Sequence, residues 1–332
     1  MPLRSTKTLI LVLCLAGCKH EARYPKKLSA WHLFTGTLSA LRPNKGVVPY
    51  DLNTPLFSDY ASKARFVRMP QGTAAKYKAD GAFDFPEGTV LSKTFAYPGR
   101  IIETRLLVRG EAGWTPLPYV WNAEQTEAFL EVAADGVRVS SGTLTIDYVI
   151  PNVNQCKECH EQAKVGQPLG PKAANLNKDF EYATGRENQL TYWTRAGILT
   201  GAPAATSVAR LAVWDDPKSG STPERALAYL EANCAHCHNP QGAASTSGLY
   251  LNASQTETMR LGVCKVPVSA GLGSGNLRFD VVPGEPEQSI LYYRMNSIVP
   301  KVMMPELGRT VIHREGVQLI REWLKGMPSA CP

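Results

Sequence analysis

Two short stretches of the chain combine cysteine and histidine at spacings that can do chemistry. Residues 156–160 read CKECH, and residues 234–238 read CAHCH. On a helix, residues three and four positions apart are neighbours, so each stretch presents two thiols and an imidazole to one flat object. A pattern that occurs twice in one chain indicates a shared chemical role rather than chance.

A haem matches this set of donors. Two cysteine sulfurs can bond its vinyl groups while the adjacent histidine binds the iron, which is the c-type mode of attachment. The sequence therefore predicts two covalently bound haem c groups. The predicted thioether residues are Cys156, Cys159, Cys234 and Cys237, and the predicted iron ligands are His160 and His238.

Two other uses of C-x-x-C pairs fit less well. The four cysteines could bind one zinc ion, but the 74 residues 160–233 separate the two pairs, which exceeds the spacing of zinc ribbons. Zinc would also leave His160 and His238 unexplained. A redox-active dithiol is expected within a βαβ pattern, which surrounds neither motif.

Each iron has a sixth coordination position. For the second motif, Met304 stands before Pro305 in a loop ahead of the last predicted helix, which resembles the sixth ligand of class I cytochromes c. Met303 is the second choice, and packing of both methionines in a core is the alternative interpretation. A thioether ligand raises the reduction potential relative to a second imidazole.

The first motif has no such candidate nearby, because neither methionine nor histidine lies between His160 and Cys234. Its sixth ligand comes from elsewhere in the chain, or the iron is five-coordinate or binds water. His236, inside the second motif, is predicted to point away from the haem and to lie at the surface. The remaining candidates are His32, His313, Met69, Met259, Met295 and Met327.

The chain begins with an export signal, predicted to cover residues 1–17. A short basic region precedes the apolar run 8–15, which is too short to span a bilayer as a permanent helix. The sequence LAGC that ends at Cys18 resembles a bacterial lipobox, which predicts cleavage before Cys18 and its acylation. An ordinary signal peptide with an incidental cysteine is the alternative. Lys19, by resemblance to the Gram-negative sorting pattern, favours the periplasmic side of the outer membrane.

Export also places the chain in an oxidising compartment. Of its eight cysteines, Cys14 leaves with the signal, Cys18 carries the lipid and four belong to the motifs. Cys264 and Cys331 remain, and two spare thiols under oxidising conditions predict one disulfide. Two unpaired buried cysteines are the alternative.

The elements that must position these residues change in type along the chain. Residues 18–44 read as a tether with a short amphipathic helix. The runs 88–97, 100–109 and 143–150 read as strands separated by glycine and proline turns. Residues 45–151 are therefore predicted to form an antiparallel β sandwich or barrel-like domain.

After residue 152 the pattern becomes helical. Thr222, Pro223 and Glu224 are typical of a helix start, and the apolar and cysteine residues from Leu227 to Cys237 recur on one helical face. A second amphipathic stripe ends at Gly326. The sequence therefore predicts a multidomain β + α chain, in which the β-rich domain is followed by a mainly α-helical haem region.

Several longer phrases carry a resemblance to known proteins. Residues 220–330 resemble a class I cytochrome c domain, which leaves 152–219 as a first haem c segment and 220–332 as the class I-like domain. The whole mature chain resembles a dihaem c-type cytochrome family of poorly known function, often encoded beside a parallel β-helix repeat protein. The phrases include DLNTPLFSDYASKARFV (51–67), FPEGTVLSKTFAY (85–97), PNVNQCKECH (151–160) and NCAHCHNPQG (233–242).

The resemblance implies haem and electron transfer, with redox proteins as partners, the lipid anchor as the membrane contact and the β-helix repeat protein as a further candidate partner. A formal charge of +7 is too weak to indicate nucleic-acid binding. The predicted function is a periplasm-facing, membrane-anchored dihaem electron carrier. The alternative is a haem enzyme, in which an open position at the first haem binds a small ligand such as peroxide. A third reading makes the β-rich domain the functional part, binding a carbohydrate or a protein.

Overall fold

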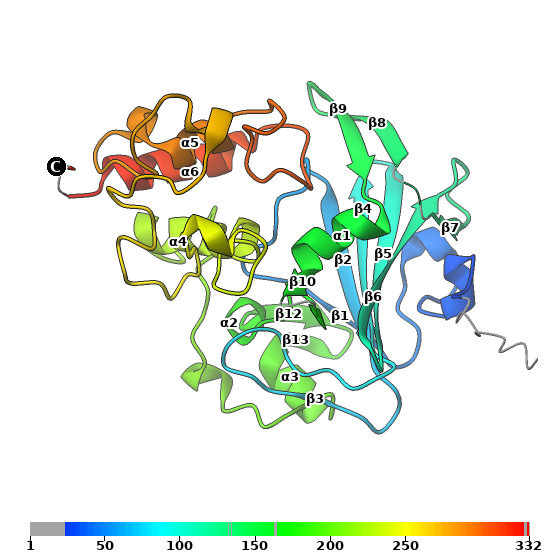
Figure 1. Ribbon diagram of the computed structural model, residues 1–332. Coiled ribbons are helices and arrows are strands. Elements are labelled where there is room, and N and C mark those ends of the chain that lie inside the picture. The colour runs from blue at the N-terminus through cyan, green and yellow to red at the C-terminus, as the bar shows by residue number, and fades with distance from the viewer. Residues whose placement is uncertain (1–23, 132, 134, 163–164, 329–330, 332) are drawn as a thin grey trace, which may run out of the picture.

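The computed structural model describes residues 24–131, 133, 135–162, 165–328 and 331. An antiparallel sheet forms one side of the molecule, α4, α5 and α6 lie on the other, and α1 lies between them (Figure 1). The predicted export signal and Cys18 lie outside the described residues. Within the described part of the chain, every helix is too short or too polar to cross a membrane.

The main sheet has six strands in the order β1-β2-β4-β5-β6-β7, and each neighbouring pair is antiparallel. Its strands are β1 (Val47–Tyr50), β2 (Ser62–Arg68), β4 (Val90–Tyr97), β5 (Arg100–Gly110), β6 (Gly113–Trp121) and β7 (Ala128–Leu130). A separate hairpin consists of β8 (Asp135–Ser141) and β9 (Leu144–Ile150). The predicted strands at 88–97, 100–109 and 143–150 are confirmed as β4, β5 and β9.

Three minor sheets have two strands each. They pair β3 (Ala75–Lys76) with β14 (Leu199–Thr200), β10 (Glu161–Gln162) with β11 (Val165–Gly166), and β12 (Asp179–Tyr182) with β13 (Gly185–Asn188). The α-helices are α1 (Val153–His160), α2 (Ala173–Leu176), α3 (Gln189–Arg195), α4 (Thr222–Asn233), α5 (Ile290–Met295) and α6 (Arg314–Lys325). The 3-10 turns are η1 (Leu28–Trp31), η2 (Leu38–Ala40), η3 (Ala205–Ser207), η4 (Ser245–Ser247), η5 (Gly271–Ser274) and η6 (Pro286–Gln288).

The predicted fold class was wrong. The described chain is mostly β, and its α-helices span only 4 to 12 residues, so no mainly α-helical cytochrome region follows the sheet. Residues 234–289 form turns and 3-10 turns, because glycine and proline interrupt the helical spacing there. The strands of the main sheet and of the β8–β9 hairpin are antiparallel, but they form one open sheet and a hairpin instead of a closed barrel, and β3 pairs with β14 in parallel. Residues 28–40 form two 3-10 turns where an amphipathic helix was predicted.

Both faces of the main sheet are covered by apolar side chains. Successive residues of a strand point to opposite faces. On one face, Val90 and Leu106 pack with the N-terminal segment, in a cluster that also buries two of the aromatic residues of β6, Tyr119 and Trp121. On the other face, Leu91 packs in a cluster that includes residues of α2 and α3. A separate apolar cluster is built from residues 214–327 and holds α4 and α6 together.

Residues 51–61, which connect β1 to β2, join the sheet to the C-terminal region, and we call them the linking segment. The Asp59 carboxylate is only 2% exposed and accepts hydrogen bonds from the N–H groups of Thr310 at 2.7 Å and Val311 at 3.0 Å. The Tyr97 hydroxyl of β4 donates to the Asp59 carbonyl oxygen at 2.6 Å. One residue therefore bonds to both sides of the molecule. Burial raises the pKa of Asp59 although these donors oppose the shift.

Phe57 and Thr54 add further contacts from the linking segment. The Phe57 N–H donates to Oδ1 of Asn233, the last residue of α4, at 2.7 Å, and the Phe57 ring stacks on His313 with ring centroids 4.0 Å apart. The Thr54 hydroxyl donates to the Ala212 carbonyl oxygen at 2.6 Å. The segment has no regular structure, and side-chain hydrogen bonds satisfy much of its backbone.

Replacement of Asp59 by alanine is expected to lower the free energy of unfolding by about 2–4 kcal/mol, because two N–H groups lose a charged acceptor. Urea denaturation measures the change. Asp147→Ala is the matched control, because its ion pair with Arg138 is exposed and such pairs contribute little. Equal losses in the two variants would show that the linking segment does not hold the two sides together.

Candidate functional site

Helix α1 carries the whole first motif. The Asn152 side chain accepts from the Gln155 N–H at 2.9 Å, and the Gln155 side chain accepts from the Asn152 N–H at 3.0 Å. This capping box fixes where the helix begins. Cys156 and Cys159 therefore lie one turn apart on the same side of α1, and His160 is its last residue.

The second motif begins where α4 ends. The prediction of one helix face that continues to Cys237 was only partly right, because α4 ends at Asn233. One further turn follows, in which the N–H groups of Cys237 and His238 donate to the Cys234 carbonyl oxygen at 3.1 Å and 2.9 Å. Asn233 stops the helix because its side chain bonds to the Tyr229 carbonyl oxygen and to the linking segment.

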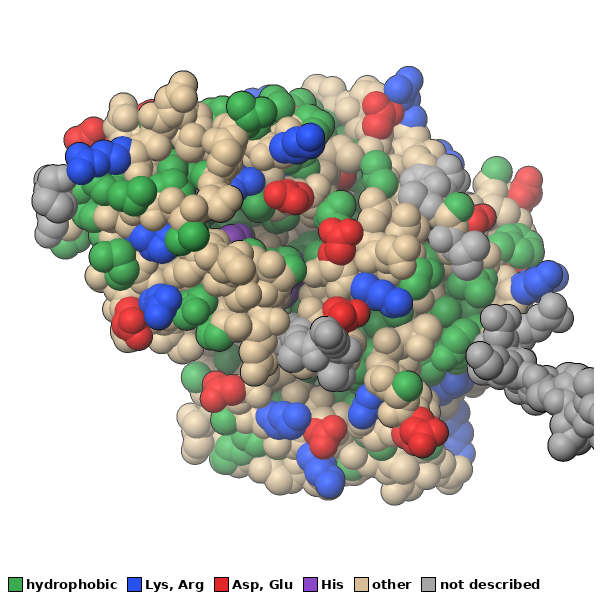
Figure 2. Space-filling model, in the orientation of Figure 1, with side chains coloured by type: hydrophobic (Ala, Val, Ile, Leu, Met, Phe, Trp, Pro, Cys, Tyr) green, Lys and Arg blue, Asp and Glu red, His purple; other side chains and the backbone are tan. Residues whose placement is uncertain are grey.

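Two adjoining cavities receive the side chains of these motifs. Cavity 1 has a volume of about 970 Å³ and is lined by Cys156, Cys159 and His160. Cavity 2 has a volume of about 320 Å³ and is lined by Cys237 and His238. Both volumes lie in the range of cofactor sites. Figure 2 shows histidine atoms in the hollow between the two sides of the molecule.

The two cavities share part of their walls, so one set of side chains lines both of them. The second motif contributes to this shared wall through Cys234 and His236, and the first through Cys159. The complete set is Cys159, Asn233, Cys234, His236, Met295, Met304, Pro305, Glu306 and Leu307. The sequence did not indicate that the two motifs would meet.

All four motif cysteines are free thiols. Burial raises the pKa of the Cys156 thiol, and burial raises the pKa of the Cys234 thiol to about 12. Both are therefore neutral thiols at neutral pH. The pKa of Cys159 is raised and that of Cys237 lowered, chiefly because these two side chains hydrogen-bond to each other.

Hydrogen bonds fix the tautomers of both motif histidines. Nδ1 of His160 lies 2.8 Å from the Gln167 carbonyl oxygen, which can only accept. Nδ1 of His238 lies 3.2 Å from the Ser247 hydroxyl oxygen, whose own hydrogen is donated to the Ala244 carbonyl oxygen at 2.7 Å. In each ring Nδ1 carries the hydrogen and Nε2 keeps a lone pair, as in histidines that bind metals.

Burial also keeps both imidazoles neutral. It lowers the pKa of His160 and the pKa of His238 to about 4 each. A neutral imidazole is the form that coordinates a metal. The two histidines are thus in the protonation state and tautomer that an iron ligand requires.

Met304 and Met303 differ in position. Met304 borders both cavities, whereas Met303 is 8% exposed and lines neither. The Met304 N–H donates to the Arg294 carbonyl oxygen at 3.0 Å, and the Met304 carbonyl oxygen accepts from Arg309 at 2.8 Å. These bonds fix the loop so that Met304 is the methionine of the pair that reaches the cavities.

Two of the six other candidates for a sixth ligand line cavity 1. They are Met295, which also borders cavity 2, and His313. Both ring nitrogens of His313 have neighbours, since Nδ1 lies 3.0 Å from the Tyr229 hydroxyl and Nε2 lies 3.8 Å from Glu315. The four candidates that line neither cavity are His32, Met69, Met259 and Met327.

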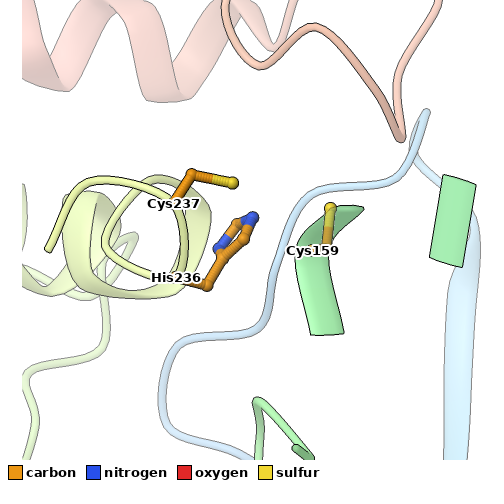
Figure 3. Close-up of side chains that lie close together, drawn as sticks. All are labelled: Cys159, His236 and Cys237. Carbon is orange, nitrogen blue, oxygen red and sulfur yellow. The ribbon is translucent and has the colours of Figure 1, made fainter. Parts of the chain in front are cut away.

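The prediction for His236 was wrong. This side chain is only 9% exposed and lies between the two motifs instead of at the surface. Figure 3 shows its ring beside the sulfur of Cys237 and facing Cys159 on α1, and the ligand atoms of the three residues lie within 4.8 Å of one another. Residue spacing along the chain could not reveal this contact, because 76 residues (160–235) separate Cys159 from His236.

Cys264 and Cys331 form the expected disulfide, with their Cα atoms 5.2 Å apart. The bond joins the C-terminal end of the chain to the loop that follows the second motif. It also removes both cysteines from the set of free thiols. In the described part of the chain, the remaining free thiols are the four cysteines of the two motifs.

The donor set fits a c-type haem at each motif. Each cavity is bordered by both free thiols of one motif and one thiol of the other, by a neutral histidine with its lone pair on Nε2, and by methionine. Thioether formation requires thiols, and iron ligation requires a neutral imidazole. The residues present therefore match the chemistry of covalent attachment at both sites.

No protein-family model matches the chain, and neither a curated protein nor a solved structure is significantly similar to it. The interpretation of the two sites therefore rests on their own geometry and chemistry. The resemblance to a dihaem cytochrome family stays a prediction.

The contact between the two motifs can be tested without any cofactor. In haem-free protein that carries Cys156→Ser and Cys234→Ser, diamide is expected to oxidise the two remaining motif thiols to a Cys159–Cys237 disulfide, because their sulfurs are adjacent. Mass spectrometry of the linked peptides detects the product. The control carries Cys159→Ser and Cys234→Ser and is expected to remain reduced. Equal cross-linking in both variants would contradict the placement of α1.

Proposed function

We propose that the chain is a dihaem c-type cytochrome that transfers electrons between redox partners. The observation that supports this function is the repeated donor set. Two C-x-x-C-H motifs far apart in the sequence direct free thiols and neutral imidazoles toward two adjoining cavities. Neither zinc binding nor dithiol chemistry explains why each pair of cysteines has its own histidine.

In cavity 1 the thiols of Cys156 and Cys159 would hold the cofactor, and Nε2 of His160 would bind the iron. When bound, the cofactor supplies a metal centre that gains and loses one electron. The Gln167 carbonyl oxygen orients the His160 ring through Nδ1 and increases the basicity of Nε2. Helix α1 presents the three donors together, so the site needs little rearrangement.

In cavity 2, Cys234 and Cys237 would form the thioethers, and His238 and Met304 would be the axial ligands. Leu249, Leu251, Ile290 and Leu291 form the apolar part of the lining of this cavity, which also includes Asp280 and Arg294. An apolar wall disfavours the extra positive charge of the oxidised state, as methionine ligation does. The side chains of cavity 2 therefore favour a comparatively high reduction potential.

The setting that we propose follows from the start of the sequence. Export through the predicted signal and acylation of Cys18 would tether the protein to the outer membrane, facing the periplasm. Covalent attachment suits this location, because a loosely held cofactor would be lost to the surroundings. A redox protein is the partner class, and a β-helix repeat protein remains a candidate.

Protein matured in a host with c-type haem attachment is expected to contain two covalent haems per chain. A pyridine haemochrome and the mass of the denatured chain count them. Met304→Ala is expected to abolish the methionine–iron charge-transfer band and to lower the potential of one haem. Met303→Ala is the matched control and should keep the band, because Met303 lines neither cavity. A band lost only in Met303→Ala would reverse the ligand assignment.

A second candidate function is supported by the cluster of Cys159, His236 and Cys237. Two thiols and an imidazole within 4.8 Å of one another are the donors that zinc prefers. Cys159 and Cys237 would form thioethers in the cytochrome, so these two residues cannot serve both functions. A zinc-binding chain would contain a site that bridges α1 and the turn after α4.

Metal analysis separates the two candidate functions. The cytochrome is expected to contain two haem irons and no stoichiometric zinc, and His236→Ala should leave the haem count unchanged. One zinc ion per chain, no covalent haem, and loss of zinc in His236→Ala would instead establish the metal site. His32→Ala, which alters a histidine outside both cavities, is the control for nonspecific effects.

A further inference from the structure

A row of three basic side chains crosses one face of the main sheet. Arg65 on β2 lies directly opposite Lys93 on β4, and Lys93 lies directly opposite Arg105 on β5. All three line cavity 1 together with Cys156 and His160. We call Arg65, Lys93 and Arg105 the basic row.

The basic row lies between an apolar row of the same sheet face and a mixed row, in which Phe95 lies opposite Lys63 and Glu103. In the adjacent row on the same face, Val67, Leu91 and Leu107 lie opposite one another on β2, β4 and β5, and all three belong to an apolar cluster. In the other direction, Phe95 belongs to another apolar cluster. Like charges directly opposite one another destabilise a sheet, and charge in an apolar interior is costly. A negatively charged neighbour would therefore stabilise such a row.

The carboxylates of the chain only partly supply that charge. Arg65 pairs with Asp51 at 2.9 Å, but Asp51 also pairs with Lys178 at 2.8 Å. Arg105 pairs with Glu103, which also accepts a hydrogen bond from the Tyr148 hydroxyl at 2.6 Å. Each carboxylate beside the row is thus shared with another donor.

Lys93, at the centre of the row, forms no ion pair with any residue in the described part of the chain. Its Nζ lies 4.7 Å from the centroid of the Phe95 ring. Burial and the charges of Arg65, Lys63 and Arg105 lower the pKa of Lys93. The charge of Glu103 opposes this shift only in part, so an anion bound in cavity 1 would favour the charged form of Lys93.

We propose that the basic row is a carboxylate-binding site, and that it receives the propionate groups of the haem held by Cys156 and Cys159. This inference rests on the proposed function at the first motif. The row and the first motif line the same cavity. Covalent attachment would hold the propionates beside the row at a high effective concentration.

A small free carboxylate has the same chemistry and is the other source of the anion. It would enter cavity 1 from solution, as a substrate of a haem enzyme would. The geometry favours the propionates, because a cofactor joined to α1 brings its carboxylates into the cavity without a separate binding step. The experiment below distinguishes the two sources.

The test compares Lys93→Gln with Lys63→Gln in the full-length protein carrying both haems. Each variant loses one lysine amine from the same sheet face, but Lys63 does not line cavity 1 and donates to the Ala61 carbonyl oxygen at 3.1 Å. Resonance Raman spectra report the propionate bending band, and spectroelectrochemical titration reports each haem's potential. Acetate is added to the unmodified protein and to both variants as the free-carboxylate probe.

Lys93→Gln is expected to shift the propionate band and to lower the potential of one haem, because the loss of a nearby cation favours the ferric state. A tenfold change in the reduction equilibrium corresponds to about 59 mV. The other haem should be unaffected, and Lys63→Gln should leave the propionate band unchanged. Lys93→Arg restores the charge and is expected to restore both readouts, which separates loss of charge from misfolding.

Other outcomes would overturn the inference in distinguishable ways. Saturable acetate binding that weakens at least about tenfold in Lys93→Gln, with an unchanged propionate band, would assign the row to a free carboxylate. No change in band, potential or acetate response would show that the row binds no carboxylate. Absence of covalent haem at the first motif would instead refute the proposed function, and acetate calorimetry on that protein would then test the row separately.

Discussion

The structure depends on the hydrogen bonds by which the linking segment joins the sheet to the C-terminal region. Asp59 is bonded on one side to β4 through Tyr97 and on the other to the N–H groups of Thr310 and Val311. Thr54, Phe57 and Asp59 themselves line cavity 1. The residues that hold the two sides together therefore also form the wall between them. If these bonds were lost, the walls of cavity 1 would separate, and the two motifs would no longer share a boundary.

The contacts of the linking segment also influence the protonation states of the motif side chains. Because both sides close over the motifs, His160 and His238 are partly buried and stay neutral, and each keeps its Nε2 lone pair. The two cavities nevertheless differ. Cavity 1 is bounded by the basic row, whereas the lining of cavity 2 combines aliphatic side chains such as Leu249 with charges of both signs, Asp280 and Arg294. Identical motifs thus have different electrostatic surroundings, and surroundings of this kind shift the potential of a bound metal centre.

Residue patterns within short windows of the sequence predicted several strands and helices correctly. Strand β9 alternates in polarity, and β4 and β5 are runs rich in apolar and β-branched residues that meet at a Pro-Gly turn. Helix α6 has a clear apolar stripe, so the positions of these elements follow from the sequence. The motif spacing likewise identified the clustered thiols and histidines. The helical content after residue 152 was overestimated, because the segment after α4 folds into short hydrogen-bonded turns that do not continue as α-helix. The contact of His236 with Cys159 and the alignment of Arg65, Lys93 and Arg105 depend on tertiary packing and on strand register, which no short window of sequence contains.

Strand register decides whether those three cations reach cavity 1 at all. Strands β4 and β5 are joined by the two residues Pro98 and Gly99, and Gly99 has a φ of 75°, which a tight turn of this type requires. A bulge follows, because Phe95 pairs with Glu103 while Ala96 pairs with Ile101. The bulge lies between the turn and the basic row, so it sets the pairing of Lys93 with Arg105. Without the extra residue, the pairing would slip by one position, and Lys93 would oppose a residue that points to the other face. The polarity of cavity 1 is thus determined by one turn and one bulge at the end of the β4–β5 hairpin.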